Sequence, residues 1–279
     1  MRLMLSFPVK PMLLQTAKEP FNSSDYVFEW KVDGIRCMAF YDHGQVRLQS
    51  KTGRDCTKAF PEFWELPVKA EEIILDGEVT VITDGKPDFE GVMKRYLANP
   101  SKVDKPAAYI VWDILWCNGE RVSDLALVNR KQLLNSIFKD NDVARKIEWV
   151  DNDGLALWQG IKVQGLEGMV AKKKNSRYVF GQRSSAWLKV KNYQEAVVNV
   201  FGYSQKEGTV LVGSQDKVQG RTLGMQKEER AVLRELIDKY GTPKGNVIWL
   251  PRGLKGRVKF TTWTPRGYMR DCSWIRFEI

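Results

Sequence analysis

Histidine is nearly absent from the sequence, with His43 the single example among 279 residues. Because histidine is the commonest general base and a member of Ser-His-Asp and Cys-His centres, its scarcity argues against enzymes of those kinds. His43 follows Asp42 and precedes Gly44, a run that is typical of a tight turn between two strands. We therefore expect a structural role for His43.

The sequence also lacks the marks of secreted and membrane proteins. Its four cysteines, Cys37, Cys56, Cys117 and Cys272, are scattered, with no Cys-x-x-Cys pair. A Cys/His zinc site is therefore not expected, and reduced thiols are the simplest state. No apolar run approaches the roughly 20 residues that a membrane-spanning helix needs, and residues 1–8 are too short for a signal peptide. We expect a cytoplasmic protein with no membrane partner.

Positive charge is what the sequence has in excess. The formal net charge of +10 predicts a polyanionic partner such as nucleic acid. The charge is uneven, because residues 193–279 hold 15 Lys/Arg against 9 Asp/Glu. A chain of 279 residues is long for a single core. We predict two domains, 1–192 and 193–279, of which the smaller grips a nucleic-acid backbone.

Hydrophobic periodicity predicts a mixture of strands and helices. In the first domain we expect strands at 26–33, 35–41, 46–50, 73–81, 108–116 and 187–191, and helices at 88–97, 123–139 and 155–163. Beyond residue 192 we expect short strands at 195–204, 209–214, 246–250 and 256–264, with one clear helix at 226–240. Several strands around one helix are typical of a small Greek-key β-barrel that binds nucleic acid, the OB-fold.

Charged side chains gather on one face of the strand expected at 26–33. Glu29, Lys31 and Asp33 are two residues apart and therefore share a face. Gly34 allows a close backbone approach, and Arg36 supplies a donor fork suited to phosphate or hydroxyl oxygens. Taken alone, this pattern also fits a solvated edge strand.

Two further strands carry paired charges of one sign. Asp76 and Glu78 share a face of an apolar strand, where carboxylates cost stability unless they bind something or pair with nearby basic residues. Lys189 and Lys191 share a strand face and repel each other unless an anion lies between them. The pairs together favour a bound nucleotide and a metal ion.

These pieces, in this order, resemble the covalent nucleotidyltransferase superfamily, and most closely the compact bacterial and phage type of ATP-dependent DNA ligase. Each motif alone is weak, but six in order are specific. They are Lys31-Val32-Asp33-Gly34-Ile35-Arg36 (motif I), Ser50-Lys51-Thr52-Gly53-Arg54 (Ia), Asp76-Gly77-Glu78 (III), Tyr109-Ile110-Val111-Trp112-Asp113 (IIIa), Glu167-Gly168-Met169-Val170 (IV) and Trp187-Leu188-Lys189-Val190-Lys191 (V). The resemblance implies an α+β fold, in which an adenylyltransferase domain of ATP-grasp-like antiparallel sheets with helices precedes the OB-fold barrel.

The resemblance also implies a reaction in three steps on nicked duplex DNA, with ATP as the AMP donor. Lys31 takes AMP from ATP, AMP passes to the 5′-phosphate of the nick, and the 3′-hydroxyl then displaces it. Lys189 and Lys191 would hold the α-phosphate, Glu29 would accept from the adenine amino group, and Trp112, where the family usually has Phe, would stack on the base. Trp112 also fits the alternative of a core aromatic residue. A monomer closing around DNA is implied.

By the same resemblance, Glu167 and Glu78 would place Mg²⁺ or Mn²⁺. Asp33 and Asp76 would orient Lys31 or support the metal, and Arg36, with Glu78, would bind the ribose hydroxyls or a phosphate. These oxygen-rich side chains suit a hard divalent cation.

The expected DNA contacts are basic. Lys51 stands where motif Ia usually has Arg, so Arg54 is expected to share its task of holding the nick 5′-phosphate. Arg276 stands near the family's C-terminal motif for the ATP pyrophosphate, although no Asp-x-Lys partner follows it. The remaining expected phosphate contacts are Lys173, Lys174, Arg177, Arg252, Lys255, Arg257 and Lys259.

Two other functions fit parts of the pattern. An RNA ligase or an mRNA capping guanylyltransferase shares the Lys-x-Asp-Gly chemistry, and use of GTP in place of ATP would favour the latter. A non-catalytic nucleic-acid-binding relative would keep the basic C-terminal part, but the intact motif residues argue against it. A NAD⁺-dependent ligase is disfavoured, because its N-terminal module and cysteine zinc site are missing from the sequence.

Overall fold

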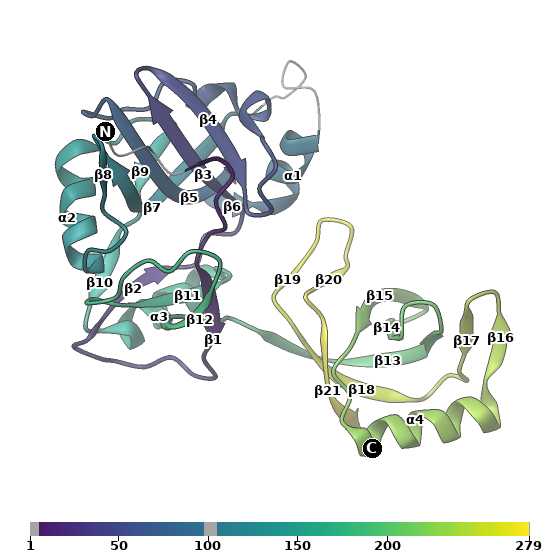
Figure 1. Cartoon of the computed structure of the whole chain (residues 1–279). Helices are drawn as coiled ribbons and strands as arrows, with labels where there is room; N and C mark the ends of the chain where they lie inside the picture. Colours follow the sequence, from purple (N-terminus) through teal and green to yellow (C-terminus); the bar gives the residue numbers. More distant parts are fainter. Residues whose placement is uncertain (1–5, 98–104, 279) are drawn as a thin grey trace. The chain divides into compact units, whose positions relative to one another are not determined.

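The computed structural model describes residues 6–97 and 105–278. The chain divides into two compact units, Met1–Val190 and Lys191–Ile279, each of which is drawn in Figure 1. The sequence-based boundary lay after residue 192. No helix in the described ranges has the length and apolar content that crossing a membrane would require.

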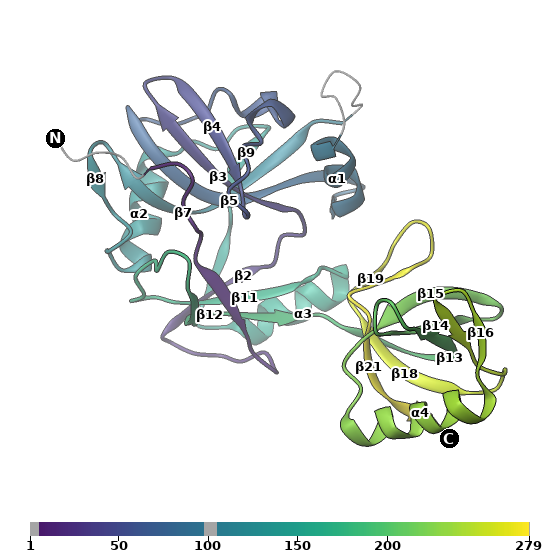
Figure 2. The ribbon, with the colours of Figure 1, turned by 45° about the vertical axis from the view of Figure 1, so that its right-hand side comes forward.

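The first unit contains two mainly antiparallel sheets (Figures 1 and 2). One has the order β1 (Leu13–Thr16), β12 (Arg183–Lys191), β11 (Gly168–Lys173), β2 (Tyr26–Trp30) and β10 (Trp149–Asp151). The other has the order β4 (Gln45–Ser50), β3 (Ile35–Asp42), β5 (Glu72–Thr83), β7 (Ala107–Cys117) and β8 (Glu120–Arg121), with β6 (Lys86–Asp88) beside β5 and β9 (Ala144–Lys146) beside β7. The pairs β1–β12 and β7–β9 are parallel.

The passage from one sheet to the other lies at motif I. β2 ends at Trp30 and β3 begins at Ile35, so the strand expected at 26–33 is shorter than predicted. Between them, the backbone at Gly34 runs against β5: a Cβ there would lie 2.3 Å from the carbonyl oxygen of Val79 and 2.9 Å from Cγ of Glu78. Glycine is therefore required for close backbone approach, and it places residues 31–34 where the two sheets meet.

The turn between β3 and β4 follows the prediction. His43 and Gly44 both have positive φ, 45° and 87°, and Asp42 pairs with Gln45. Two central residues of positive φ match the twist of an antiparallel hairpin.

Helices α1 (Phe89–Leu97), α2 (Leu127–Ile137) and α3 (Gly154–Gln164) complete the unit, with short 3₁₀ turns at Thr57–Ala59 and Pro61–Phe63. The helix expected at 123–139 begins later, because the Ser123 hydroxyl accepts a hydrogen bond from Arg121 and the Ser123 carbonyl accepts one from the backbone of Tyr178, instead of capping a helix. In α3 the Asp153 carboxylate caps the start, and Gly165 ends the helix in the left-handed conformation.

The second unit is built around one ring of paired strands. β14 (Thr209–Ser214) pairs with β13 (Gln194–Ser204) on one side and with β15 (Lys217–Thr222) on the other. Just after β15, Leu223 forms a parallel bridge with Ser273, the first residue of β21 (Ser273–Glu278). β21 pairs with β18 (Lys255–Phe260), and β18 pairs with β13, which closes the ring. β16 (Thr242–Lys244) and β17 (Val247–Trp249) extend this sheet, β19 (Thr262–Trp263) and β20 (Met269–Arg270) form a hairpin, and α4 (Lys227–Tyr240) is the helix of the unit's described part. The sequence did not predict β15, β16, β20 or β21.

Candidate active site

A cavity of about 400 Å³ lies in the first unit between its two sheets. Its walls come from β2, β11 and β12 on one side and from β3, β5 and β7 on the other. Of the side chains that the sequence predicts at a nucleotide site, the structure brings these to the cavity wall: Glu29, Lys31, Arg36, Lys51, Glu78, Trp112 and Lys189.

Lys31 is held at the cavity by both its backbone and its side chain. Its N–H donates to the carbonyl of Gly168 at 2.7 Å, and its Nζ donates to Oε2 of Glu167 at 2.6 Å. The side chains of Lys31 and Glu167 are 21% and 9% exposed, so the pair is shielded but reachable. Burial raises the pKa of Glu78 to about 8, against the opposing effect of the nearby Lys31 and Arg36 charges. Glu78 therefore carries an acidic proton near neutral pH unless a cation compensates its charge.

The guanidinium of Arg36, in the cavity wall, is hydrogen-bonded to Asp76 and Tyr178. Its Nε and Nη2 donate to the two oxygens of Asp76 at 3.0 and 2.6 Å, while Nη1 donates to the carbonyl of Met12. Tyr178 accepts from Arg36 and donates to Asp76 at 2.8 Å. Both oxygens of the fully buried Asp76 are therefore engaged, and Asp76 does not line the cavity.

Glu29 lies at the cavity wall between two lysines that sequence reasoning did not place at the site. Its Oε1 is 2.5 Å from Nζ of Lys131, and its Oε2 is 2.6 Å from Nζ of Lys172. Lys172 also lies 5.1 Å from the ring centroid of Trp112 and 4.3 Å from that of Trp187. Burial lowers the pKa of Lys172 to about 8, although the charge of Glu29 opposes the shift.

Trp112 reaches the cavity because of an irregularity in β7. Opposite β5, the register steps from Asp113 to Val111 between Asp76 and Gly77, which leaves Trp112 as an extra residue on β7. Such a bulge changes the direction of a side chain. Trp112 is partly buried: one part of its side chain packs against the core around Trp187, and another part lines the cavity. Both expectations for Trp112, a core aromatic residue and a stacking surface for a base, therefore describe part of its surface.

Buried polar atoms without a well-formed hydrogen bond concentrate at this cavity. In the part of the chain that the structure describes, five buried side-chain nitrogen or oxygen atoms make no hydrogen bond of proper geometry. Four of them belong to cavity residues: the indole nitrogens of Trp112 and Trp187, and two atoms that lie in ion pairs, Oε1 of Glu29 and Nζ of Lys172. Because buried polar atoms are nearly always hydrogen-bonded, the two indole N–H groups suit this cavity to a polar ligand.

Asp33 lies elsewhere in the first unit. The backbone carbonyl of Asp33 accepts from the hydroxyl of Thr80 at 2.8 Å, and Asp33 does not line the cavity. Lys191 is the last residue of β12 and the first of the second unit, in which it pairs with Asp271 at 2.5 Å. Arg276 of the second unit pairs with Glu278 at 3.1 Å.

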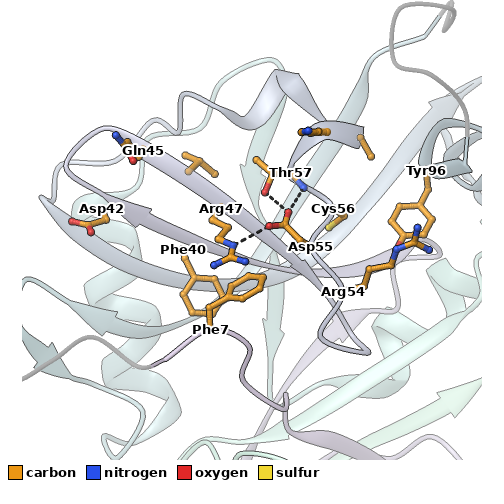
Figure 3. A pocket seen from close by; sticks show the side chains of 13 residues that line it. Phe7, Phe40, Asp42, Gln45, Arg47, Arg54, Asp55, Cys56, Thr57 and Tyr96 are labelled. Carbon is orange, nitrogen blue, oxygen red and sulfur yellow. Dashed lines mark hydrogen bonds and ion pairs between the residues drawn. The ribbon is translucent and has the colours of Figure 1, made fainter.

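Arg54 lines a different hollow, an open groove of about 910 Å³ along β4 (Figure 3). Its guanidinium lies 5.9 Å from the ring centroid of Tyr96. In the same groove, Arg47 stacks on Phe7 and pairs with Asp55 at 2.9 Å. The structure thus separates Arg54 from Lys51, which lines the cavity between the sheets.

The remaining basic side chains mostly have acidic or aromatic neighbours. Three of them form ion pairs: Lys174 with Asp151, Arg252 with Asp216 at 2.8 Å, and Arg257 with Glu278 at 2.5 Å. The ammonium of Lys259 lies 4.8 Å from the ring centroid of Tyr193. The other three, Lys173, Arg177 and Lys255, are exposed. These contacts are on the surface, where ion pairs contribute little to stability and can be exchanged for phosphates.

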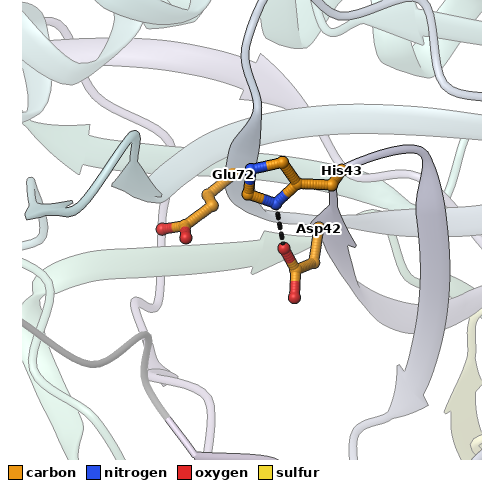
Figure 4. Close-up of side chains that lie close together, drawn as sticks. All are labelled: Asp42, His43 and Glu72. Atoms are coloured by element: carbon orange, nitrogen blue, oxygen red, sulfur yellow. Dashed lines mark hydrogen bonds and ion pairs between the residues drawn. The ribbon is translucent and has the colours of Figure 1, made fainter.

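The predicted metal residues do not form a cluster. Within residues 6–97 and 105–278, one group of three carboxylate or imidazole ligands lies within 4.8 Å, and it is Asp42, His43 and Glu72 (Figure 4). Asp42 and His43 are exposed, and the hydrogen bond that the His43 ring donates to the Asp42 carboxylate raises the pKa of His43. Asp76 is committed to Arg36, so Glu78 and Glu167 are the predicted metal residues that remain near Lys31.

Residues 4–191 match the family model of the ATP dependent DNA ligase domain. The chain belongs to the ATP-dependent DNA ligase family. Among curated relatives of this ligase-family chain, the SPbeta prophage-derived DNA ligase-like protein LigB of Bacillus subtilis (strain 168) is 38% identical over 209 residues, covering 75% of this chain and 76% of LigB. The bifunctional non-homologous end joining protein LigD of the same strain is 28% identical over 99% of this chain, which spans only 49% of that LigD.

Solved structures agree on the ligase-domain fold. A mycobacterial DNA ligase D complexed with ATP and MES aligns with a TM-score of 0.61 at 26% identity, covering 97% of this chain and 95% of the other. A Lig E DNA ligase aligns with a TM-score of 0.66 at 20% identity, over 95% and 98% of the two chains, which concerns the fold alone. These matches confirm a mixed α/β ligase-domain fold, which is the coarser part of the α+β architecture expected from the sequence.

Proposed function

We propose that this member of the family seals nicks in duplex DNA through a covalent lysyl–AMP on Lys31. The observation that carries the proposal is the cavity between the sheets. Its wall holds Lys31, which pairs with Glu167, together with Lys189, the Glu29 carboxylate and the indole nitrogen of Trp112, which has no hydrogen-bond partner. Adenine would stack on Trp112, its amino group would donate a hydrogen bond to Glu29, and Lys189 would neutralise the α-phosphate. Phosphoryl transfer depends chiefly on such positioning and charge compensation.

In the first step, the bond between Nζ of Lys31 and the α-phosphorus forms as the bond to pyrophosphate breaks. Nζ begins as an ammonium and ends as a phosphoramidate N–H, so it releases two protons. The carboxylate of Glu167 accepts the hydrogen bond of Nζ at 2.6 Å and is placed to receive the first proton, while the second passes to water. The second and third steps transfer AMP to the 5′-phosphate of the nick and then join the strand.

The residues present fit a divalent cation through two carboxylates rather than three. Glu78 and Glu167 lie near Lys31, and mutual repulsion with Glu167 contributes to the raised pKa of Glu78. Bound Mg²⁺ or Mn²⁺ would supply positive charge to the phosphate oxygens. Because both oxygens of Asp76 are engaged by Arg36 and Tyr178, we assign Asp76 to holding Arg36 at the cavity wall. The four Arg36 N–H groups used in these bonds leave one on Nη1 for a ribose or phosphate oxygen.

We further propose that residues 193–279 are an OB-fold that binds the DNA backbone. Support comes from the ring of β13, β14, β15, β21 and β18, with α4 between β15 and β18 in sequence. On strand β18, Lys255, Arg257 and Lys259 are alternate residues and lie on the face of the strand that is not buried. Lys51 and Arg54 of motif Ia would contact the DNA from the first unit.

The test is sealing of a nicked duplex with ATP and Mg²⁺ by the wild type, by Lys31→Ala and by Lys139→Ala. Lys139 is an exposed lysine just beyond α2 and serves as the matched control. We expect the wild type and the control to seal the nick and to carry label from α-labelled ATP through denaturation, and Lys31→Ala to do neither. Equal sealing by Lys31→Ala would end the proposal, and labelling by GTP instead of ATP would favour a capping-type enzyme.

A further inference from the structure

Lys131 is a buried cation that belongs to none of the motifs. It lies on α2 with a side chain only 5% exposed, and its Nζ is 2.5 Å from Oε1 of Glu29 and 3.4 Å from the carbonyl oxygen of Trp112. Lys172 approaches the same carboxylate from β11, through Oε2. Two cations therefore hold one carboxylate, which is itself 2% exposed.

This arrangement is costly for folding. Each buried charge loses its hydration, and two ammonium groups around one carboxylate leave a net positive charge in the cavity wall. The neighbouring Arg130 shows how α2 is fixed there: it is fully buried and donates to both oxygens of Asp113 at 2.8 Å. Asp113 directly follows Trp112, so α2 is fastened to the strand that carries the aromatic wall of the cavity. The position of Lys131 relative to Glu29 is therefore fixed by the packing of α2 against β7.

The geometry also leaves hydrogen-bonding capacity at Glu29. A carboxylate has about four lone-pair positions, and each oxygen of Glu29 lies against one lysine. Oε1 lies at ion-pair distance from Lys131 but makes no hydrogen bond of proper geometry within the described part of the chain. Because Glu29 lines the cavity, an amino group of a ligand can donate to this oxygen.

We propose that Lys131 is a positioning residue that fixes the Glu29 carboxylate and thereby sets the preference for a purine with a 6-amino group. The inference rests on the proposed function, in which Lys31 is charged with a nucleotide at this cavity. With Lys131 removed, the carboxylate turns toward Lys172 and loses the orientation that accepts from the amino group. A purine with a carbonyl at that position gains nothing from Glu29 in either case, so its use changes little.

The experiment measures lysyl–nucleotide formation with ATP and with inosine triphosphate, in which a carbonyl replaces the 6-amino group. The variants are Lys131→Met and Lys131→Arg, with Lys139→Met, just beyond the end of α2, as the exposed control. We expect Lys131→Met to raise KM for ATP by about tenfold to a hundredfold, the worth of one hydrogen bond to a charged group. KM for inosine triphosphate and kcat should stay within about twofold, and Lys131→Arg should restore most of the preference.

A merely structural role for Lys131 would lower the melting temperature without changing the ratio of the two KM values. A folded Lys131→Met variant with the wild-type ratio therefore overturns the inference. If that variant does not fold, Lys131→Gln replaces it, and an unchanged ratio there overturns the inference equally. A wild type that forms no lysyl–nucleotide with either substrate overturns the proposed function and this inference with it, whereas an active wild type with an unchanged variant ratio overturns the inference alone.

Discussion

Asp76→Asn should destabilise the first unit without changing its need for Mg²⁺. Asp76 is fully buried and binds the guanidinium of Arg36, whose side chain is 11% exposed, through two hydrogen bonds. In the variant, an amide NH₂ would face a guanidinium N–H, and the Arg36 charge would lose its partner. Removing one member of a buried ion pair costs about 3–5 kcal/mol. For a unit of this size that corresponds to a fall in melting temperature of about 6–20 °C.

The measurement combines thermal unfolding with a Mg²⁺ titration of lysyl–AMP formation. Tyr178→Phe is the graded control, because it removes one hydroxyl that contacts both Arg36 and Asp76 and should cost about 1–3 kcal/mol. The double variant Arg36→Met with Asp76→Asn should cost less than the sum of the singles, since the orphaned cation is gone. A stable Asp76→Asn protein whose half-saturating Mg²⁺ concentration rises about tenfold would refute the reasoning, because Asp76 would then act as a metal ligand.

Two other outcomes follow from the same site. Gly34→Ala should reduce lysyl–AMP formation at least about tenfold, because the new Cβ would lie 2.3 Å from the carbonyl oxygen of Val79 and would displace Glu78. A single-turnover assay with α-labelled ATP measures the rate. A wild-type rate in this variant would contradict the packing argument. KM for ATP should rise with pH above about 8, because Lys172 there loses the proton that lets it hold Glu29. In the Lys172→Arg variant the side chain stays charged, so this rise in KM should vanish. An identical pH profile of KM in the two proteins would exclude Lys172 as the titrating group.

The sequence predicted those features of the fold that depend on alternation along a strand. In β12, Trp187 packs into one core while Leu188 and Val190 pack into another, as period-two alternation requires. The register also places Glu78 opposite Arg36, with Asp76 on the same face. Lys31 and Lys189, predicted from separate strands, line one cavity.

Other features could not be predicted because they depend on contacts between distant segments. Asp76 was expected near a metal, but its partner Tyr178 is 102 residues away in the chain, and nothing local in the sequence indicates that pair. Lys131 on a helix is typical of a solvated face, yet tertiary packing buries it against Glu29. The bulge that turns Trp112 toward the cavity leaves no trace in the apolar run of β7, since periodicity cannot locate one extra residue in a strand buried on both faces.

Residues 31–34 join the two sheets of the first unit, and this affects the stability of the protein once AMP is covalently attached to Lys31. In the proposed reaction the nucleotide is attached to this connection and lies against β2 on one side and β7 on the other. An ordinary ligand stabilises a fold in proportion to the logarithm of its free concentration. A bonded nucleotide stays with the chain on dilution, so the AMP-bearing and AMP-free proteins are two separate chemical species with two melting temperatures. Their ratio in a preparation then records the reaction history of the protein rather than the ATP present in the buffer.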